Sequence, residues 1–289
     1  MTNLWQRLRS LPRNVWAVTL TSLLTDISSE MVVYLLPLFL SNVLGVKTSI
    51  IGLIEGVAET TSSLLKLFSG FWSDRMGRRK SLTVAGYGLS TVAKPFLLLV
   101  QGWPGVLAVR FVDRAGKGIR TAPRDALIAD SVSADRRGFA FGLHRAGDTL
   151  GAFIGVGVAL LIVLATQSSA VDLSRETFNL VVLISIIPAV LAVIALVMIA
   201  REVRRPPDPS AKRPRLAWGA LPSAFRHFVI VLVLFTLGNS SDAFLILRAQ
   251  NLGVSVTATL LMVMTFNLVY TLVSGPAGAL SDRIGRKRL

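Results

Sequence analysis

The residues best equipped for chemistry in this sequence are charged side chains that interrupt long apolar stretches. One stretch carries seven of them, and at 100° per residue they share one face of a helix, within an arc of about 140°. They are Arg110, Asp113, Arg114, Lys117, Arg120, Arg124 and Asp125. An ionisable group at bilayer depth costs roughly 2.5 to 3.5 kcal/mol to insert, so this face needs a protein interior or water around it.

Carboxylates in two other stretches are suited to neutralise that basic face. Glu55 and Glu59 lie one helical turn apart, and so do Asp26 and Glu30. We expect these faces to converge on a central polar cavity that handles protons or binds a solute. Ion pairing that only holds helices together is the alternative for each charge. The cavity residues expected from the basic face are Arg110, Asp113, Arg114 and Lys117.

Two further pairs are candidates for the same cavity. His144 and Asp148 lie one turn apart, and a histidine exchanges protons near neutral pH. The alternative is a buried hydrogen-bonded pair beside a seam of glycines. Asn239 and Asp242 are expected to line the other side of the cavity. Phosphate-loop, metalloprotease and serine-hydrolase motifs are missing, and only two histidines are present, so no cofactor, metal site or enzymatic activity is expected.

The elements that must position these charges are membrane-spanning helices. Hydrophobic residues make up 52% of the 289 residues and charged residues 16%. The hydrophobic residues gather in blocks of about twenty, the length that an α-helix needs to cross a bilayer. The blocks lack the two-residue alternation of apolar and polar side chains that is typical of a barrel strand. The sequence therefore predicts an all-α polytopic membrane protein. The expected spans are 15–43, 48–72, 81–100, 105–131, 138–165, 178–200, 225–249 and 257–280.

The distribution of basic residues predicts the orientation of these spans. The formal net charge of +15 is concentrated in the amino-terminal segment, in alternate connections and in the tail, which places those parts at the cytoplasmic face of a plasma membrane. This explains the charge without a nucleic-acid partner. The segment 202–222 is rich in proline and basic residues, so we expect a cytoplasmic linker between bundles at 1–201 and 223–289. Contact with lipid headgroups is its simplest role.

A short motif, G-x-x-S-D-R-x-G-R-[RK], occurs twice, each time after the second span of a bundle. Glycine permits close helix approach or a turn, and aspartate can pair with arginine or cap a helix. We expect a gating role for its residues. They are Gly70, Asp74, Arg75, Gly77 and Arg78 in the first copy and Gly278, Asp282, Arg283, Gly285 and Arg286 in the second.

Two copies of this motif in equivalent loops, with a basic central linker, resemble the major facilitator superfamily. The resemblance implies a six-helix amino-terminal bundle and the first two helices of a carboxy-terminal bundle, so the sequence is expected to stop short of the family's twelve helices. It also implies a role in proton transfer for Arg114, within a variant of the R-x-x-Q-G element in which Lys117 replaces glutamine. Arg110 is the second choice.

The leading hypothesis is therefore a secondary carrier, monomeric in the bilayer, that moves a small organic solute by alternating access and is coupled to protons. A basic stripe favours an anionic or zwitterionic solute, whereas the acidic residues would suit a cation, as in a multidrug antiporter. The missing proline after Gly151 weakens the antiporter interpretation. A fragment or assembly partner that transports nothing is the alternative from a different class.

Overall fold

The computed structural model describes residues 4–166, 171–203, 218–239 and 241–284, and within these ranges the regular elements are all helical. The predicted fold class, an all-α polytopic membrane protein, is confirmed. The elements are α1 (Leu4–Arg9), α2 (Arg13–Val33), α3 (Leu36–Leu38), η1 (Phe39–Val43), α4 (Thr48–Met76), α5 (Arg79–Ala93), η2 (Lys94–Leu99), α6 (Trp103–Ser131), η3 (Ala134–Arg136), α7 (Arg137–Thr166), α8 (Arg175–Ile199), η4 (Trp218–Ala220), α9 (Ser223–Leu237), α10 (Asp242–Asn251) and α11 (Val256–Ile284).

The first six predicted spans correspond to long helical segments. The first span is built from three consecutive pieces, because α2 ends at Val33 and Pro37 falls in the opening turn of α3. The predicted seventh span, 225–249, is wrong as a single helix. The helix α9 ends at Leu237, and α10 starts after Ser241, whose side chain accepts a hydrogen bond from the Ala243 amide at 3.4 Å.

Six stretches of the described chain are long and apolar enough to cross a membrane by length and composition. They are Arg13–Val43, Arg79–Leu99, Ala134–Thr166, Arg175–Ile199, Ser223–Asn251 and Val256–Val273. The helices α4 and α6 are 29 residues long but carry the charges described above. A charged helix of this length at the centre of a membrane bundle must turn its polar face inward.

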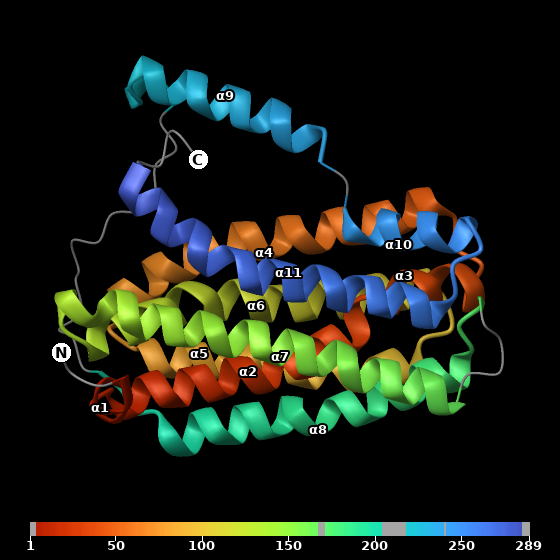
Figure 1. Cartoon of the computed structure of the whole chain (residues 1–289), viewed down its shortest axis with the longest axis horizontal. Helices are drawn as coiled ribbons and strands as arrows, with labels where there is room; N and C mark the ends of the chain where they lie inside the picture. Colours follow the sequence, from red (N-terminus) through yellow and green to blue (C-terminus); the bar gives the residue numbers. More distant parts are fainter. Residues whose placement is uncertain (1–3, 167–170, 204–217, 240, 285–289) are drawn as a thin grey trace.

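The helices lie side by side with their axes roughly aligned, and α9 stands apart from the rest (Figure 1). The helix α6 packs between α4 and α5, whereas α2 packs on α7 and α8. The later helices join this bundle through α10, which contacts α3 and α4, and through α11, which contacts α7. Stacked rings of Phe39 and Phe178, 4.0 Å between centroids, join the first span to α8.

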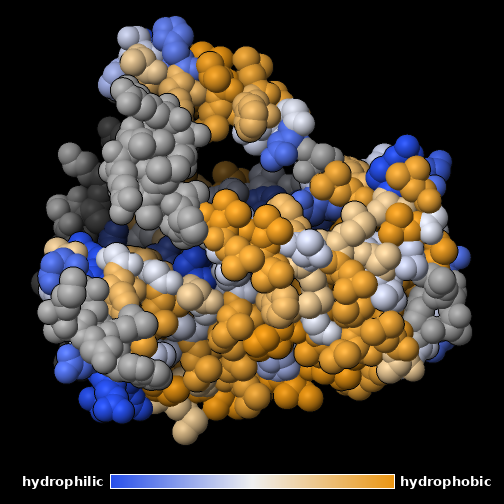
Figure 2. Space-filling view, in the orientation of Figure 1, coloured by the Kyte–Doolittle hydropathy of each residue, from blue (hydrophilic) through white to orange (hydrophobic). Residues whose placement is uncertain are grey.

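The flank of the bundle is hydrophobic and its ends are hydrophilic (Figure 2). On α7 and α8 the outward side chains include Leu161, Ile187 and Met198, which are 67%, 60% and 72% exposed. Large apolar side chains at such exposure would be unfavourable in water but are suited to lipid. The chain is therefore a multi-pass membrane protein, with its polar face turned toward the bundle interior.

Candidate functional site

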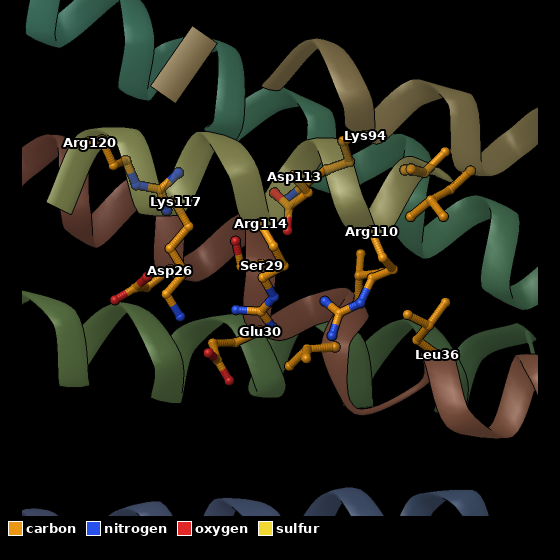
Figure 3. Close-up of a pocket in the computed structure, with 14 residues that line it drawn as sticks. Asp26, Ser29, Glu30, Leu36, Lys94, Arg110, Asp113, Arg114, Lys117 and Arg120 are labelled. Atoms are coloured by element: carbon orange, nitrogen blue, oxygen red, sulfur yellow. The ribbon is translucent and has the colours of Figure 1, made fainter. Parts of the chain in front are cut away.

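A charged cavity lies between α2 and α6, with one wall completed by the junction of α5 and η2 (Figure 3). Its volume is about 130 Å³. The polar residues that line it are Asp26, Ser29, Glu30, Lys94, Arg110, Asp113, Arg114, Lys117 and Arg120. Six of the residues expected from the sequence are therefore brought together: Asp26, Glu30, Arg110, Asp113, Arg114 and Lys117.

Glycines on α6 explain why its charges face the cavity. A Cβ atom on Gly116 would lie 2.5 Å from the carbonyl oxygen of Gly86 on α5, and one on Gly118 would lie 2.7 Å from the carbonyl oxygen of Ser62 on α4. Since neither position leaves room for a side chain, α6 is held closely against both neighbours. The charged side chains are left with the open side of the helix, toward α2.

The two glutamates of α4 pair with the arginines of α6. The Arg110 guanidinium donates to both carboxylate oxygens of Glu55, at 2.7 and 2.6 Å, and both side chains are largely buried. Arg114 lies 3.3 Å from the carboxylate of Glu59, a side chain that is 58% exposed. Neither glutamate lines the cavity, so both neutralise the arginines of its wall from outside the cavity. The Nε atoms of Arg110 and Arg114 are buried without a hydrogen-bond partner.

The carboxylates of α2 are arranged differently. Asp26 and Glu30 project into the cavity from the side opposite Arg114 and Lys117 (Figure 3). Among the described residues, no ion pair within 4.0 Å joins either carboxylate to a cation. The two walls therefore carry unlike charges that face each other across the cavity without direct contact.

Two cavity residues were not among the sequence candidates. Lys94 is buried where α5 meets η2, and its ammonium group donates a hydrogen bond to Ser28. In the sequence, Lys94 is a single lysine inside an apolar span. A charged group at that depth is costly unless it lies in the protein interior or in water, so the position alone indicates an inward-facing side chain. Arg120 belongs to the stripe, and it donates to Ser90 at 2.8 Å and lies over the ring of Tyr87, 4.3 Å from its centroid.

The His144 and Asp148 pair lies outside the cavity lining. The ring Nε2 of His144 lies 3.7 Å from the Asp148 carboxylate, beyond a good hydrogen bond, and both ring nitrogens are buried without a hydrogen-bond partner. Arg124 of α6, which also lies outside the cavity lining, pairs with Asp125 at 2.9 Å.

The expected residues from the seventh span lie elsewhere. Asn239 is exposed after the end of α9 and lines neither cavity named here. Asp242 lines a second, mainly apolar cavity of about 210 Å³ between α10 and α11. Tyr34 lines that second cavity and is within hydrogen-bonding reach of Glu30, so it lies between the two spaces. The break after α9 accounts for the separate positions of Asn239 and Asp242.

The first copy of the signature motif surrounds the end of α4. Gly77 has φ of 62° and ends the helix, a backbone conformation that glycine adopts readily. The partner of Asp74 is Arg79, at 2.6 Å, whereas Arg75 and Arg78 are exposed. Gly70 faces the Ala122 side chain of α6, which would lie 3.4 Å from an added Cβ.

Arg79, which was not a site candidate, joins this motif to α6. It is 6% exposed and also contacts Asp130, at 3.4 Å. In the second copy of the motif, Gly278, Asp282 and Arg283 fall within α11, whereas Gly285 and Arg286 lie outside the described residues.

Comparison with known sequences gives a consistent result. The family model described as Major Facilitator Superfamily matches residues 18–289. An uncharacterized MFS-type transporter of Methanocaldococcus jannaschii is 37% identical over 287 residues, which cover 96% of this chain and 69% of that protein. An uncharacterized protein of Mycobacterium tuberculosis is 29% identical over 258 residues, which cover 85% of this chain and 60% of that protein.

Solved structures share the fold. A bacterial homolog of the human lysosomal transporter Spinster, in an inward-facing conformation, superposes with a TM-score of 0.72 at 20% identity. That match covers 96% of this chain and 64% of the other. A D-xylose-proton symporter gives a TM-score of 0.69 at 16% identity and covers 96% of this chain and 70% of the symporter. The chain thus spans about two thirds of the length of these relatives.

Proposed function

The chain belongs to the major facilitator superfamily, and from this membership we propose that it acts as a secondary carrier of a small polar solute. The observation that carries the proposal is the charged cavity between α2 and α6, set inside a bundle whose flank is apolar. Charged groups are expensive at this depth and are retained where they bind ions or solutes. Alternating exposure of this cavity to the two sides of the membrane would move its contents.

Coupling to protons is assigned to Arg114 together with the carboxylates of α2. Arg114 holds Glu59 at 3.3 Å, a looser pair than Arg110 makes with Glu55, and its Nε has no hydrogen-bond partner. A guanidinium in this position can move from one carboxylate to another when a proton neutralises the first. His144 and Asp148 are the second candidate, since a histidine titrates near neutral pH.

The gate proposed for the outer side lies where α10 meets the amino-terminal helices. The side chain of Gln250 donates to the Val171 carbonyl at 3.3 Å, and Asp172 accepts from Asn42 at 3.3 Å. The Phe244 ring packs against Gly52. A Cβ atom added to Gly52 would lie 2.8 Å from the Cζ of this ring. In this proposal, residues 1–201 and 223–289 are the moving units, the linker 202–222 is cytoplasmic, and the membrane is the plasma membrane.

The size of the cavity bears on the competing kinds of solute. Pockets for drug-sized molecules measure about 300 to 1,000 Å³, whereas this cavity is about 130 Å³. A small organic ion is therefore favoured over the large hydrophobic cations of a multidrug antiporter. The alternative from another class, an assembly partner without transport activity, makes no use of a charged cavity.

Transport by the purified 289-residue chain in lipid vesicles tests the proposal. Under an imposed pH gradient, we measure the uptake of radiolabelled L-alanine, succinate and ethylamine, and the accompanying proton flux with a trapped pH-sensitive dye. Accumulation that a protonophore abolishes is the expected result. Absence of accumulation for all three solutes would favour the assembly partner.

Variants then test the assignment of Arg114. Arg114→Ala is expected to abolish solute-driven proton flux, while Lys47→Ala, an exposed control, retains it. Unchanged flux in Arg114→Ala would refute the coupling role.

A further inference from the structure

We propose that the cavity between α2 and α6 is built for a small zwitterion, with the ammonium group of the solute against α2 and its carboxylate against α6. This inference rests on the proposed function and names its substrate class. It follows from how the charges are distributed over the two walls and from which of them already have partners.

The two walls of the cavity have opposite sign. The α2 wall presents Asp26 and Glu30, with the hydroxyl of Ser29 in the turn between them. The α6 wall presents Arg114 and Lys117 opposite these carboxylates (Figure 3). A solute that spans the gap therefore meets negative charge at one end and positive charge at the other.

Most other charges of the cavity are already matched. Arg110 is held by Glu55, and Arg120 by Ser90 and the ring of Tyr87. Lys94 donates to Ser28 and faces Asp113 on its own side of the cavity (Figure 3). Apart from the Nε of Arg110, which has no hydrogen-bond partner, these groups form the wall and need no ligand to complete them.

The charges left over are balanced in number. Two cations, Arg114 and Lys117, face two carboxylates, Asp26 and Glu30, of which Glu30 also has the Tyr34 hydroxyl within hydrogen-bonding reach. Among the described residues, Lys117 takes part in no ion pair within 4.0 Å. Arg114 makes a 3.3 Å contact with the exposed Glu59, whereas Arg110 is held by both oxygens of the largely buried Glu55. A solute with one charge of each sign complements both walls at once, because each of its charged groups meets unlike charge.

A solute with a single charge fits less well. A simple anion would approach Arg114 and Lys117 but would lie close to the carboxylates of α2, and a simple cation would meet the reverse repulsion. Like charges in a site of low dielectric oppose each other strongly. Walls of opposite charge therefore disfavour both a simple anion and a simple cation. Repulsion of competing ligands in this way is a source of specificity.

The unpartnered donors of α6 point to a carboxylate as the anionic group. The guanidinium groups of Arg110 and Arg114 both line the cavity, and their Nε atoms are buried without a hydrogen-bond partner. Planar carboxylates accept paired hydrogen bonds from guanidinium nitrogens. The volume of about 130 Å³ limits the solute to a few heavy atoms, the size of a small amino acid.

Equilibrium binding to the purified full chain in detergent tests the inference without requiring transport. Isothermal titration compares L-alanine and β-alanine with propionate, which lacks the ammonium group, and ethylamine, which lacks the carboxylate. At least one zwitterion is expected to bind tenfold or more tightly than either control. Equal or tighter binding of propionate or ethylamine, or no binding of either zwitterion, overturns it.

Variants assign the two ends of the solute to the two walls. Asp26→Asn should abolish the preference for alanine over propionate while propionate still binds, which also shows that the variant is folded. Lys117→Met should abolish the preference for alanine over ethylamine, and Lys47→Met, outside the cavity, should change neither. If both preferences survive in Asp26→Asn and Lys117→Met, the assignment is wrong.

The result is separable from the proposed transport function. Binding of alanine without accumulation in vesicles would retain the zwitterion site and refute the carrier. Accumulation of succinate or ethylamine in preference to alanine would retain the carrier and refute the zwitterion site.

Discussion

Replacement of Gly155 by alanine should loosen the contact between α2 and α7 that supports the α2 wall. A Cβ atom at Gly155 would lie 2.5 Å from the carbonyl oxygen of Ile27 and 3.0 Å from its Cα. Ordinary van der Waals contact begins near 3.4 Å, so the two backbones must separate by about 0.9 Å. The residues on either side of Ile27 are Asp26, which lines the cavity, and Ser28, which accepts from Lys94.

The expected loss of stability follows from overpacking. Insertion of a methyl group into a closely packed contact costs about 1 to 3 kcal/mol. Glycine to alanine within a helix also gains roughly 0.5 to 1 kcal/mol from the backbone, and a control must remove this term. Gly142→Ala provides it, because Gly142 lies on the same helix and has no atom within 4 Å of its added Cβ.

The difference between the two variants therefore isolates the steric clash. For a chain of this size, about 1 to 3 kcal/mol corresponds to roughly 2 to 12 °C in the melting temperature. We expect Gly155→Ala to melt below Gly142→Ala by this amount in detergent, and to bind alanine more weakly. Equal melting temperatures would refute the close approach of α2 and α7 on which the placement of Asp26 depends.

Two further outcomes are expected. Glu55→Ala should lower the free energy of unfolding by about 3 to 5 kcal/mol, because it leaves the buried guanidinium of Arg110 unpaired, whereas Glu59→Ala, at an exposed carboxylate, should cost less than about 1 kcal/mol. Thermal unfolding measures both, and equal losses would contradict the difference in burial. The chain has no cysteine, so a membrane-impermeant maleimide should label Lys47→Cys in intact cells but not Arg137→Cys. The reverse pattern would invert the proposed topology.

The helical spans could be predicted because their signal is local. The structure contains the expected apolar helices and the charged face of α6, because each depends only on residues close together in sequence. The break between α9 and α10 was missed for the opposite reason. Ser241 caps the start of α10 through one hydrogen bond, and Gly238 follows the last residue of α9; both are weak signals inside a stretch of high hydropathy.

The candidate site could be predicted only in part, because pairing depends on contacts distant in sequence. The stripe indicated which residues of α6 face inward, but not that Glu55 lies behind the cavity and Asp26 within it. The spacing of the signature motif allows several arginines as partners for Asp74. In the structure its partner is Arg79, which is buried. Lys94 is one charge in an apolar span and forms no pattern with other residues, so only the cost of a charge at bilayer depth indicates it.

The walls of the cavity belong to two groups of helices that pack more closely within each group than with each other. Gly116 and Gly118 hold α6 against α5 and α4, whereas Gly155 holds α2 against α7. The direct packing of α2 on α6 is far less extensive than the packing within each group. Because Coulomb energy varies inversely with distance, a small displacement between the groups changes the attraction of the two walls for a bridging solute. Both groups lie within residues 1–201, so a solute that bridges the two walls would draw together helices of one proposed moving unit, and transport would still require movement of that unit against 223–289.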